Sequence, residues 1–487
     1  MGSPREASCS PSPSVRRSSN RLLQVIALVL LVFLAVATQI PSPISFTASN
    51  AFRSPEGVST ADKFEHMFAT KTKYWDQRDG SSNYNDAVMV ESLMTLSGVA
   101  EATERAPLRQ ELELIQTQIV ARHGIRYPTG GNIKEINDLL EKLKPFRDLL
   151  PAWMKNYTLP YNLSVQGELA VTGQHELRKL GADSLARSGH SSPVTYSKGK
   201  YRLAHTHVAR TRDSAIAFAG SFFENPKDVE YIEYPKSKDI FLRFFDQCER
   251  YQRDVKKNQT AQKQLHEFQR SSVMAKVAQW LKQALGLKGE DINFSAKDLM
   301  AVQSACAFDI AIYHHKHHWC SLMSMTFIHS LDYLDDLEEF YWIGGGYRIN
   351  YEMAAVLLRE VFSEMTGRVT GNSTLEGNFF FAHAETTLPL MTLLGYGDRS
   401  LLLANATEAA IKARGFRTSI LSPFAANLQF RLHERKSSGK KEFYVQVLVN
   451  EKQVPIPGCG RVFCKLSELE NLWHYYLKTY NFHEDCL

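Results

Sequence analysis

The pattern of apolar and polar positions predicts two buried strands that each end in a polar cluster. Residues Gln116–Ala121 alternate as a strand does and lead into Arg122-His123-Gly124. Residues Gly377–Ala382 form a second apolar strand, and His383-Ala384-Glu385 follows it at once. Ligands of open α/β sheets bind beyond the carboxyl ends of the strands. The two polar clusters are therefore predicted to be two halves of one site.

Between these strands, residues 224–335 carry long amphipathic stretches, which predict an inserted and mostly helical domain. One apolar face ends at Gly286, a plausible C-cap, and consists of Leu265, Phe268, Val273, Val277, Trp280 and Leu281. A second apolar face consists of Phe327, Leu331, Leu334 and Tyr341. Further along, alternation over 428–432 and 443–449 across a polar link that contains glycine predicts a hairpin.

The N-terminal region has the pattern of a targeting segment. Three arginines precede an apolar run, Leu22–Ala37, in which Gln24 is the one polar residue. The run is short for a membrane span and ends in the small-x-small sequence Ala35-Val36-Ala37. This favours a cleaved signal peptide, although the long segment before the run leaves a signal anchor open. The Ser-, Pro-, Ala- and Thr-rich stretch that follows is expected to be a linker. The predicted parts are targeting segment 1–37, linker 38–60, α/β core 61–223, helical insertion 224–335 and α/β core 336–487.

The charge and the cysteine content indicate which partners and which cellular compartment are to be expected. The formal charge is +5, and the segment expected to be removed accounts for +3 of it, which leaves about +2 and argues against a nucleic-acid partner. Six of the seven cysteines lie beyond that segment, an even number that is typical of an oxidising compartment. Cys459 and Cys464 bracket a short loop and are predicted to pair, while the other pairings stay open.

Asn-x-Ser/Thr sequons spread along the chain support the same compartment. They predict a glycoprotein of the secretory pathway, either secreted or lumenal, and attached to a membrane only if the N-terminal apolar segment stays uncleaved. The candidate glycosylation sites are Asn156, Asn162, Asn258, Asn293, Asn372 and Asn405.

The run that begins at Arg122 has the residues for phosphoryl transfer. By average residue usage, Arg-His-Gly-x-Arg-x-Pro occurs by chance in about one chain of this length in ten thousand. Arg122 and Arg126 place a guanidinium on each side of His123, and the guanidinium fork matches phosphate oxygens. The imidazole can then attack phosphorus and form a covalent phosphohistidine. The alternative is a turn histidine flanked by solvated arginines.

Departure of an alkoxide needs a proton donor, and the second strand end supplies one. We assign His383 to holding the phosphate and Glu385 to protonating the leaving oxygen and later activating water. A histidine there could instead be a satisfied core residue. A further cation is expected from Arg210 or Arg212, just before a helix predicted to begin near Ser214, unless both are solvated surface arginines.

A histidine-rich run at 314–318 raises the question of a metal site, because clustered imidazoles bind Zn and Cu. The run lacks acidic partners and contains Lys316, and arginines already neutralise phosphate in the proposed chemistry. We interpret the run as a solvated helix end, and we expect no metal and no cofactor.

The chain resembles the histidine acid phosphatases, and within them the branch of multiple inositol polyphosphate phosphatases, or phytases. His-Ala-Glu separates this branch from relatives with His-Asp. The resemblance covers most of the chain after residue 65, and its residues are Ala121–Thr129, Gly167–Leu169 through Gly173, Arg210 with Asp213-Ser214 and Phe218, Trp319–Leu322, Tyr333–Tyr341, Gly346-Tyr347, Ile349-Asn350, His383–Glu385 and Pro423–Leu428. One departure is Gly344-Gly345-Gly346-Tyr347, where animal members have Gly-Tyr-Gly-Tyr.

The resemblance implies an α/β histidine-phosphatase core, a mixed sheet flanked by helices, beside a smaller and mostly helical domain. It implies that His123 is the nucleophile and Glu385 the proton donor. The phosphate pocket would consist of Arg122, Arg126, Arg210 and His383. The resemblance selects Arg210 over Arg212, because the family's pocket arginine stands four residues before a serine at a helix start. The expected substrate is small and polyphosphorylated, such as inositol hexakisphosphate (phytate). The alternatives are a broad acid phosphatase that also accepts 2,3-bisphosphoglycerate, and a non-catalytic anion-binding glycoprotein on the same fold.

Overall fold

A mixed β-sheet forms the centre of the computed structural model, which describes residues 66–74, 112–435 and 441–486. In the described part of the chain the strand order is β3-β2-β4-β1-β5-β6-β7, and β8 pairs with β6. The strands are β1 (Leu112–Arg122), β2 (Tyr201–Thr206), β3 (Tyr231–Tyr234), β4 (Gly377–Ala382), β5 (Asn427–Arg435), β6 (Phe443–Val449), β7 (Lys452–Gln453) and β8 (Phe463–Lys465). The predicted strands and the predicted hairpin, β5 with β6, are confirmed.

The parallel half of the sheet brings the two predicted site segments to one edge. β4 lies between β1 and β2 and runs parallel to both. Arg122 pairs with Ala382 at the ends of β1 and β4, and the backbone N–H of His123 donates to the carbonyl oxygen of Ala382 at 3.0 Å. His123 and His383 therefore leave the sheet side by side, although 260 positions separate them in the chain.

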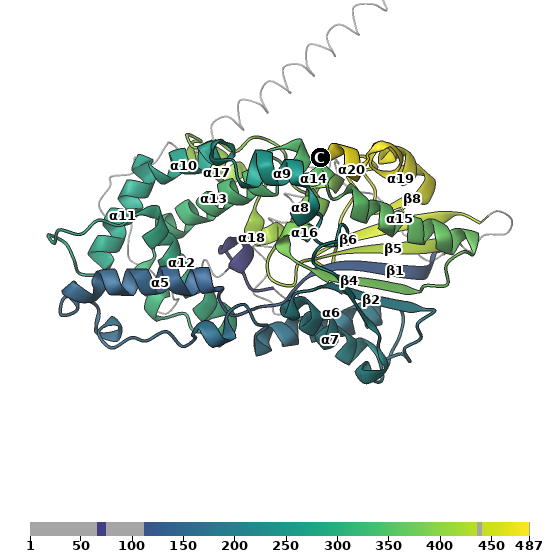
Figure 1. Cartoon of the computed structure of the whole chain (residues 1–487), viewed down its shortest axis with the longest axis horizontal. Helices are drawn as coiled ribbons and strands as arrows, with labels where there is room; N and C mark the ends of the chain where they lie inside the picture. Colours follow the sequence, from purple (N-terminus) through teal and green to yellow (C-terminus); the bar gives the residue numbers. More distant parts are fainter. Residues whose placement is uncertain (1–65, 75–111, 436–440, 487) are drawn as a thin grey trace, which may run out of the picture. The chain divides into compact units, whose positions relative to one another are not determined.

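Helices cover both faces of the sheet (Figure 1). Alternate residues of β1 enter different cores: Ile119 packs with α6 (Val171–Arg187) and α7 (Ala209–Phe222), and Val120 joins the larger core on the other face. The elements of that other face include α14 (Arg348–Glu352), α15 (Ala355–Thr370), α16 (Ala384–Leu394), α19 (Leu466–Leu472) and α20 (Phe482–Asp485).

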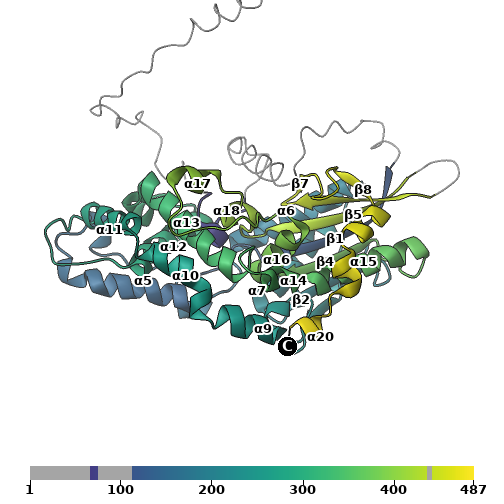
Figure 2. The ribbon, with the colours of Figure 1, turned by 90° about the horizontal axis from the view of Figure 1, so that it is seen from above.

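A group of longer helices extends from one end of the sheet (Figures 1 and 2). It comprises α5 (Gly130–Leu143), α10 (Lys263–Gln269), α11 (Ser272–Ala284), α12 (Ala296–Tyr313) and α13 (Met325–Trp342), with the short α17 (Glu408–Ala413) and α18 (Thr418–Leu421). A Ser295–Asp298 capping box starts α12, which ends where His314 adopts the left-handed conformation. Gly286, just beyond α11, has φ +79°, the conformation of the predicted C-cap.

The helical range differs from the prediction at its boundaries. Its first residues include β3, a half-buried edge strand without clear alternation, so the expected start at residue 224 is too early. α5, α17 and α18 come from outside 224–335, and Ser59–Leu487 forms one compact unit with a core shared between sheet and helices. The predicted apolar face at 265–281 is divided between α10 and α11, and Val273 and Trp280 are exposed.

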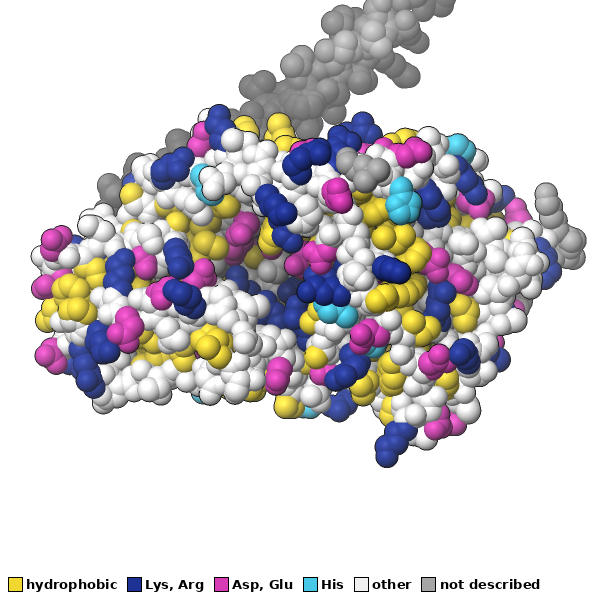
Figure 3. All heavy atoms as spheres, in the orientation of Figure 1, with side chains coloured by type: hydrophobic (Ala, Val, Ile, Leu, Met, Phe, Trp, Pro, Cys, Tyr) yellow, Lys and Arg dark blue, Asp and Glu magenta, His cyan; other side chains and the backbone are white. Residues whose placement is uncertain are grey.

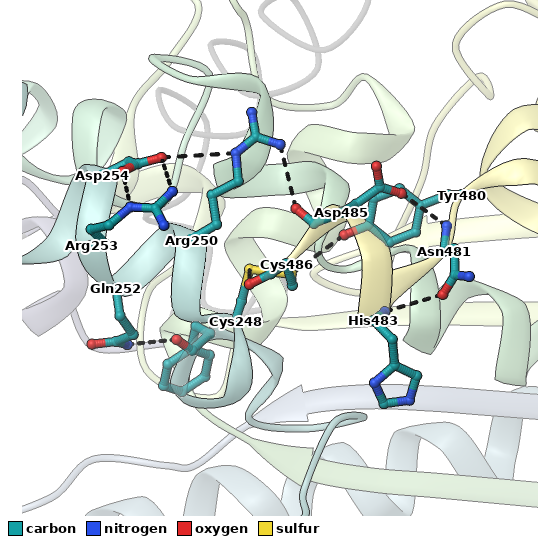
Figure 4. Close-up of a disulfide and its surroundings, with 11 residues drawn as sticks. Cys248, Arg250, Gln252, Arg253, Asp254, Tyr480, Asn481, His483, Asp485 and Cys486 are labelled. Atoms are coloured by element: carbon teal, nitrogen blue, oxygen red, sulfur yellow. Dashed lines mark hydrogen bonds and ion pairs between the residues drawn. A yellow bond between two sulfur atoms is a disulfide. The ribbon is translucent and has the colours of Figure 1, made fainter.

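Three disulfides tie the described chain together. Cys459–Cys464 is present as predicted, and the remaining pairs are Cys306–Cys320 and Cys248–Cys486. Figure 4 shows the last of these, which joins the segment after α8 (Phe244–Gln247) to the end of the chain. The backbone N–H of Arg250 donates to the carbonyl oxygen of Cys486 at 2.8 Å beside it.

The structure describes only some of the residues on which the other predictions about the secretory pathway depend. Asn258 is half-buried, and the other five sequon asparagines are exposed: Asn156, Asn162, Asn293, Asn372 and Asn405. The predicted targeting segment 1–37 and linker 38–60 lie outside the described residues. Within the residues that the structure describes, no helix has the length and apolar character needed to span a bilayer.

Candidate active site

The loop after β1 is held by close backbone contact with α6. A Cβ on Gly124 would lie 2.4 Å from the carbonyl oxygen of Gly173, and a Cβ on Gly173 would lie 2.1 Å from that of Ile125. Only glycine fits at either position without displacing backbone. The loop ends at Thr129, whose side chain caps α5 by accepting from the backbone N–H of Asn132. The histidine loop is therefore fixed at both ends.

His123 is buried and set in one tautomer. Its Nδ1 lies 2.9 Å from the carbonyl oxygen of Gly124, and because a carbonyl only accepts, Nδ1 carries the proton. Nε2 is then left with a free lone pair. Burial lowers the pKa of His123 well below its ordinary value, and Arg210 and Arg122 lower it further. The imidazole is therefore neutral and has the form that a nucleophile needs.

Arg122 and Arg126 stand beside this imidazole on an apolar floor. Arg122 donates from Nη1 to the carbonyl oxygens of Thr70 and Ser422, each at 2.7 Å, and lies 4.7 Å from the centre of the Phe424 ring. Burial lowers the pKa of Arg122 to about 10. Burial, followed by Arg210 and Arg122, lowers that of Arg126 to about 9. Guanidiniums that repel one another when buried are stabilised by an anion placed between them.

The third guanidinium belongs to Arg210 and not to Arg212. Arg210 lies in the first turn of α7, and its Nε is buried without a hydrogen-bond partner. Arg212 is exposed, with a side-chain exposure of 54%, and pairs with the adjacent Asp213. The Oγ of Ser214 donates to the carbonyl oxygen of Arg210 at 2.8 Å and accepts from the backbone N–H of Gly124 at 3.2 Å. Ser214 therefore links α7, which carries Arg210, to the loop after β1, which carries His123.

The expected helix start near Ser214 is wrong. The helix begins at Ala209, so Arg210 and Arg212 are helical residues and do not precede the helix. The N-cap residue, Val208, makes no side-chain cap. The usual Ser, Thr, Asp or Asn signal is therefore missing from the sequence at this boundary.

His383 follows β4 and forms the N-cap of α16. Its Nε2 lies 2.9 Å from Nη1 of Arg243 and 3.0 Å from Oγ1 of Thr206. A guanidinium only donates, so Nε2 accepts and Nδ1 carries the proton. Burial lowers the pKa of His383 well below its ordinary value, with Arg210 and Arg243 adding to the effect. The ring centre lies 5.7 Å from that of His123, so a neutral N–H donor stands next to the nucleophile.

Glu385 lies in the first turn of α16 and is half-buried. Its charge raises the pKa values of Arg122, Arg126 and Arg210, which places its carboxyl group within electrostatic reach of all three guanidiniums. The structure thus brings together the six residues singled out in the sequence, namely Arg122, His123, Arg126, Arg210, His383 and Glu385. Figure 3 shows a hollow in the surface with basic side chains inside it.

Two residues of the site escaped the sequence analysis. Arg243 lies just before α8, in the range assigned to the helical insertion, and its Nε donates to Asp246 at 2.8 Å. No motif marks it. Thr206 ends β2, and a search for polar residues at the ends of all the parallel strands would have found it.

The histidine-rich run lies at the end of α12. His314 is the left-handed C-cap of that helix, and the His318 ring stacks on Trp153 at 5.0 Å. Among the described residues, no group of three or more His, Cys, Asp or Glu side chains is placed to hold a metal ion.

Comparisons with known proteins relate the chain to phosphatases. The model of the histidine phosphatase superfamily (branch 2) matches residues 113–450. Multiple inositol polyphosphate phosphatase 1 of Homo sapiens is 29% identical over 459 residues, which cover 88% of this chain and 90% of the relative. The Gallus gallus protein of that name is 30% identical over 391 residues, covering 76% of this chain and 84% of the relative.

Solved structures share the fold at low sequence identity. The phytase from D. castellii superposes with a TM-score of 0.65 at 16% identity, covering 82% of this chain and 87% of that structure. The multiple inositol polyphosphate phosphatase of Bifidobacterium longum, in complex with inositol hexasulfate, gives 0.61 at 17% identity, covering 83% and 97%.

Proposed function

The chain belongs to branch 2 of the histidine phosphatase superfamily, and from this membership we propose that it removes phosphate from inositol polyphosphates through a phosphohistidine on His123. The observation that carries the proposal is the neutral His123, with Nε2 free, beside the buried guanidinium of Arg122 and the half-buried guanidiniums of Arg126 and Arg210. A phosphate monoester held by those guanidiniums presents its phosphorus to Nε2.

The reaction then takes two steps. In the first, Nε2 of His123 forms a bond to phosphorus while the ester P–O bond breaks, and Glu385 gives its proton to the departing alkoxide. In the second, Glu385 takes a proton from water as the water oxygen attacks phosphorus. The N–P bond breaks, and inorganic phosphate and free His123 result. Arg122, Arg126, Arg210 and the N–H of His383 balance the charge on the phosphoryl oxygens in both steps.

The substrate class rests on the relatives. The human and chicken proteins are named multiple inositol polyphosphate phosphatases, and the Bifidobacterium structure holds inositol hexasulfate, whose sulfates stand in for phosphates. Several anionic groups on one ring suit a hollow lined by cations, since one phosphate can occupy the guanidiniums while others meet Arg243 and its surroundings.

The experiment that tests this proposal measures phosphate release from phytate, p-nitrophenyl phosphate and 2,3-bisphosphoglycerate with a chelator present. Purified chain is incubated with each substrate, and the products are separated by ion-exchange chromatography. We expect stepwise loss of phosphate from phytate with chelator present, and none with His123→Ala. Phosphate release from the other two compounds alone would favour a broad acid phosphatase, and no release from any of them would favour an anion-binding protein.

The compartment is part of the same proposal. Three disulfides support passage through an oxidising compartment, and the exposed sequons agree with it. The chain would be secreted or lumenal, or held at a membrane if the N-terminal apolar segment is retained. Peptide mass spectrometry of protein made in a eukaryotic host, before and after removal of N-glycans, tests both the cleavage site and the sequons.

A further inference from the structure

A pocket of about 1130 Å³ lies beyond the end of β3. Its walls are the turn after β3, α8, the one-turn helix α9 (Glu249–Tyr251) and the π-helix η6 (Gln252–Lys256). Every lining residue is charged or polar, so the pocket suits a charged ligand and gives an apolar one nothing to bury against. We call it the lysine pocket, and its charged lining residues are Lys236, Arg243, Asp246, Glu249, Arg253 and Lys257.

Arg243 belongs both to this pocket and to the candidate active site. Its Nη1 donates to Nε2 of His383 at 2.9 Å, and its Nε donates to Asp246 at 2.8 Å. The guanidinium therefore has His383, a proposed phosphate ligand, on one edge and a carboxylate of the pocket on another. A ligand in the lysine pocket is separated from His383 by this one side chain.

The topology of the sheet places the pocket beside the site. β3 runs parallel to β2, β2 to β4 and β4 to β1, so the carboxyl ends of all four strands lie at one edge. His123 follows β1, His383 follows β4, and Lys236 comes two positions after β3. Burial lowers the pKa of His207, which follows β2, and the charges of Arg243 and Lys236 lower it further. This effect agrees with the placement of both cations at that edge.

Two of the four cations that line the pocket have no carboxylate partner among the described residues. Arg243 is engaged as described above, and Arg253 donates to Asp254 at 2.7 and 3.1 Å (Figure 4). The exposed Lys236 and Lys257 form no such ion pair within the described part of the chain. Four cations face two carboxylates in the lining, so positive charge is in excess and the pocket favours an anion.

We propose that the lysine pocket is an anion subsite in which Lys236 and Lys257 hold a phosphate group of the substrate other than the one that His123 attacks. The inference rests on the proposed function and deepens it, because it assigns the preference for polyphosphorylated substrates to these two lysines. Both phosphates belong to one molecule, so binding of one raises the effective concentration of the other at its own site. A monophosphate occupies only the site at His123.

The first test measures this preference in Lys236→Gln, Lys257→Gln and the double variant. For each protein, kcat/KM for phytate is divided by kcat/KM for p-nitrophenyl phosphate at one pH and low ionic strength, so that effects on folding and on the shared chemistry cancel. We expect the ratio to fall about threefold in each single variant and about tenfold in the double variant, because exposed ion pairs are individually weak and are screened by salt. An unchanged ratio in the double variant would overturn the proposal.

Lys238→Gln is the matched control. Lys238 is exposed in the same turn after β3, where its backbone N–H donates to the carbonyl oxygen of Pro235, but it does not line the pocket. We expect its ratio to equal that of wild type. An equal fall in Lys238→Gln and Lys236→Gln would mean that the general charge of the surface acts, which would contradict the subsite.

Glu249→Gln gives a test in the opposite direction. Glu249 is an exposed carboxylate of the lining and repels any anion held there. Its removal should raise the ratio of phytate to p-nitrophenyl phosphate about threefold, an effect that damage to the fold does not produce. A ratio that stays level or falls in this variant would count against an anion in the pocket.

A binding experiment separates this inference from the proposed function. Inositol hexasulfate is titrated calorimetrically into wild type and the double variant Lys236→Gln/Lys257→Gln. We expect one hexasulfate per chain in both proteins, bound about tenfold more weakly by the variant. Two per chain in wild type and one in the variant would show an independent anion site, which would overturn the proposal.

The two kinds of failure are distinguishable. Equal affinity of both proteins for hexasulfate, with phytate hydrolysis by wild type intact, would overturn the inference alone. Weaker binding by the double variant, with no phytate hydrolysis by wild type, would overturn the proposed function alone.

Discussion

Arg243 donates from Nη1 to Nε2 of His383 at 2.9 Å, a contact between residues 140 positions apart. The contact makes Nε2 an acceptor and leaves the Nδ1 proton of His383 available for a phosphate oxygen. The charge of Arg243 also lowers the pKa of His383. Arg243 is therefore a positioning residue that sets both the tautomer and the charge of a phosphate ligand.

The first prediction concerns this contact. Arg243→Ala removes a hydrogen bond from a charged donor, which is worth about 1.5–3 kcal/mol, so kcat/KM should fall about 10- to 100-fold. The pKa of His383 should rise, and the acidic limb of the pH–rate profile should move upward because a cationic His383 forms at higher pH. Arg243→Lys keeps the charge and should recover part of the rate. A drop in rate with an unmoved pH profile in Arg243→Ala would mean that the residue acts only on structure.

The second prediction separates two neighbouring arginines. Arg210→Ala should reduce kcat/KM by about 100-fold or more, because the variant loses a half-buried guanidinium that the proposed mechanism places on the transferred phosphoryl group. Arg212→Ala, two positions further along α7, should stay within about twofold of wild type, because that side chain is exposed and pairs with Asp213. Steady-state kinetics on p-nitrophenyl phosphate checks both. Comparable losses in the two variants would contradict the assignment of the pocket.

The third prediction isolates the proton donor. Glu385→Gln cannot protonate the leaving alkoxide, so phytate hydrolysis should fall about 100- to 1000-fold. With p-nitrophenyl phosphate, whose phenolate leaves without a proton, the loss in the phosphorylation step should be about tenfold or less. Single-turnover kinetics measures that step directly. An equal loss on both substrates would show that Glu385 does not act as the acid.

The fourth prediction concerns stability and pH. Asp309 of α12 is buried, and burial raises its pKa from 3.8 to about 7. Between these two values the folded chain keeps a proton that the unfolded chain releases. The resulting stability is fully present below about pH 4 and is lost as the pH rises through about 7. Asp309→Asn, which cannot ionise, should not show this loss, which is up to about 4 kcal/mol for the wild type.

Melting temperatures of both proteins between pH 4 and pH 8 test that expectation. The two melting curves should lie close together at pH 4, and wild type should fall below Asp309→Asn toward pH 8. Exposed Asp291, changed to Asn, provides a control that should follow wild type throughout. Parallel melting profiles for all three proteins would contradict the raised pKa.

The sequence revealed the two halves of the site because both lie at the ends of buried strands. β1 and β4 each end in an apolar stretch, Ile119–Ala121 and Phe379–Ala382, so the polar residues that follow stand out where the strands stop. The parallel pairing that joins the halves follows from the general rule for open α/β sheets, and β4 beside β1 fulfils it. The short loop between Cys459 and Cys464 likewise made their pairing predictable.

Features that depend on tertiary packing could not be found in the same way. Arg243 reaches His383 only because β4 and the segment before α8 meet in the fold. The start of α7 has no capping side chain, and β3 is half-buried without alternation, so neither boundary had a local signal. The Cys248–Cys486 pair closes a loop of 238 positions, which no spacing rule predicts.

The central claim is that His123 carries the phosphoryl group. The most direct measurement mixes the chain with ³²P-labelled phytate, quenches within milliseconds in alkali, where phosphohistidine survives, and maps the label by peptide mass spectrometry. We expect one labelled site, at His123, that accumulates in the burst phase and is absent from His123→Ala. Label on another residue, or phosphate release with no labelled peptide at any time, would contradict it.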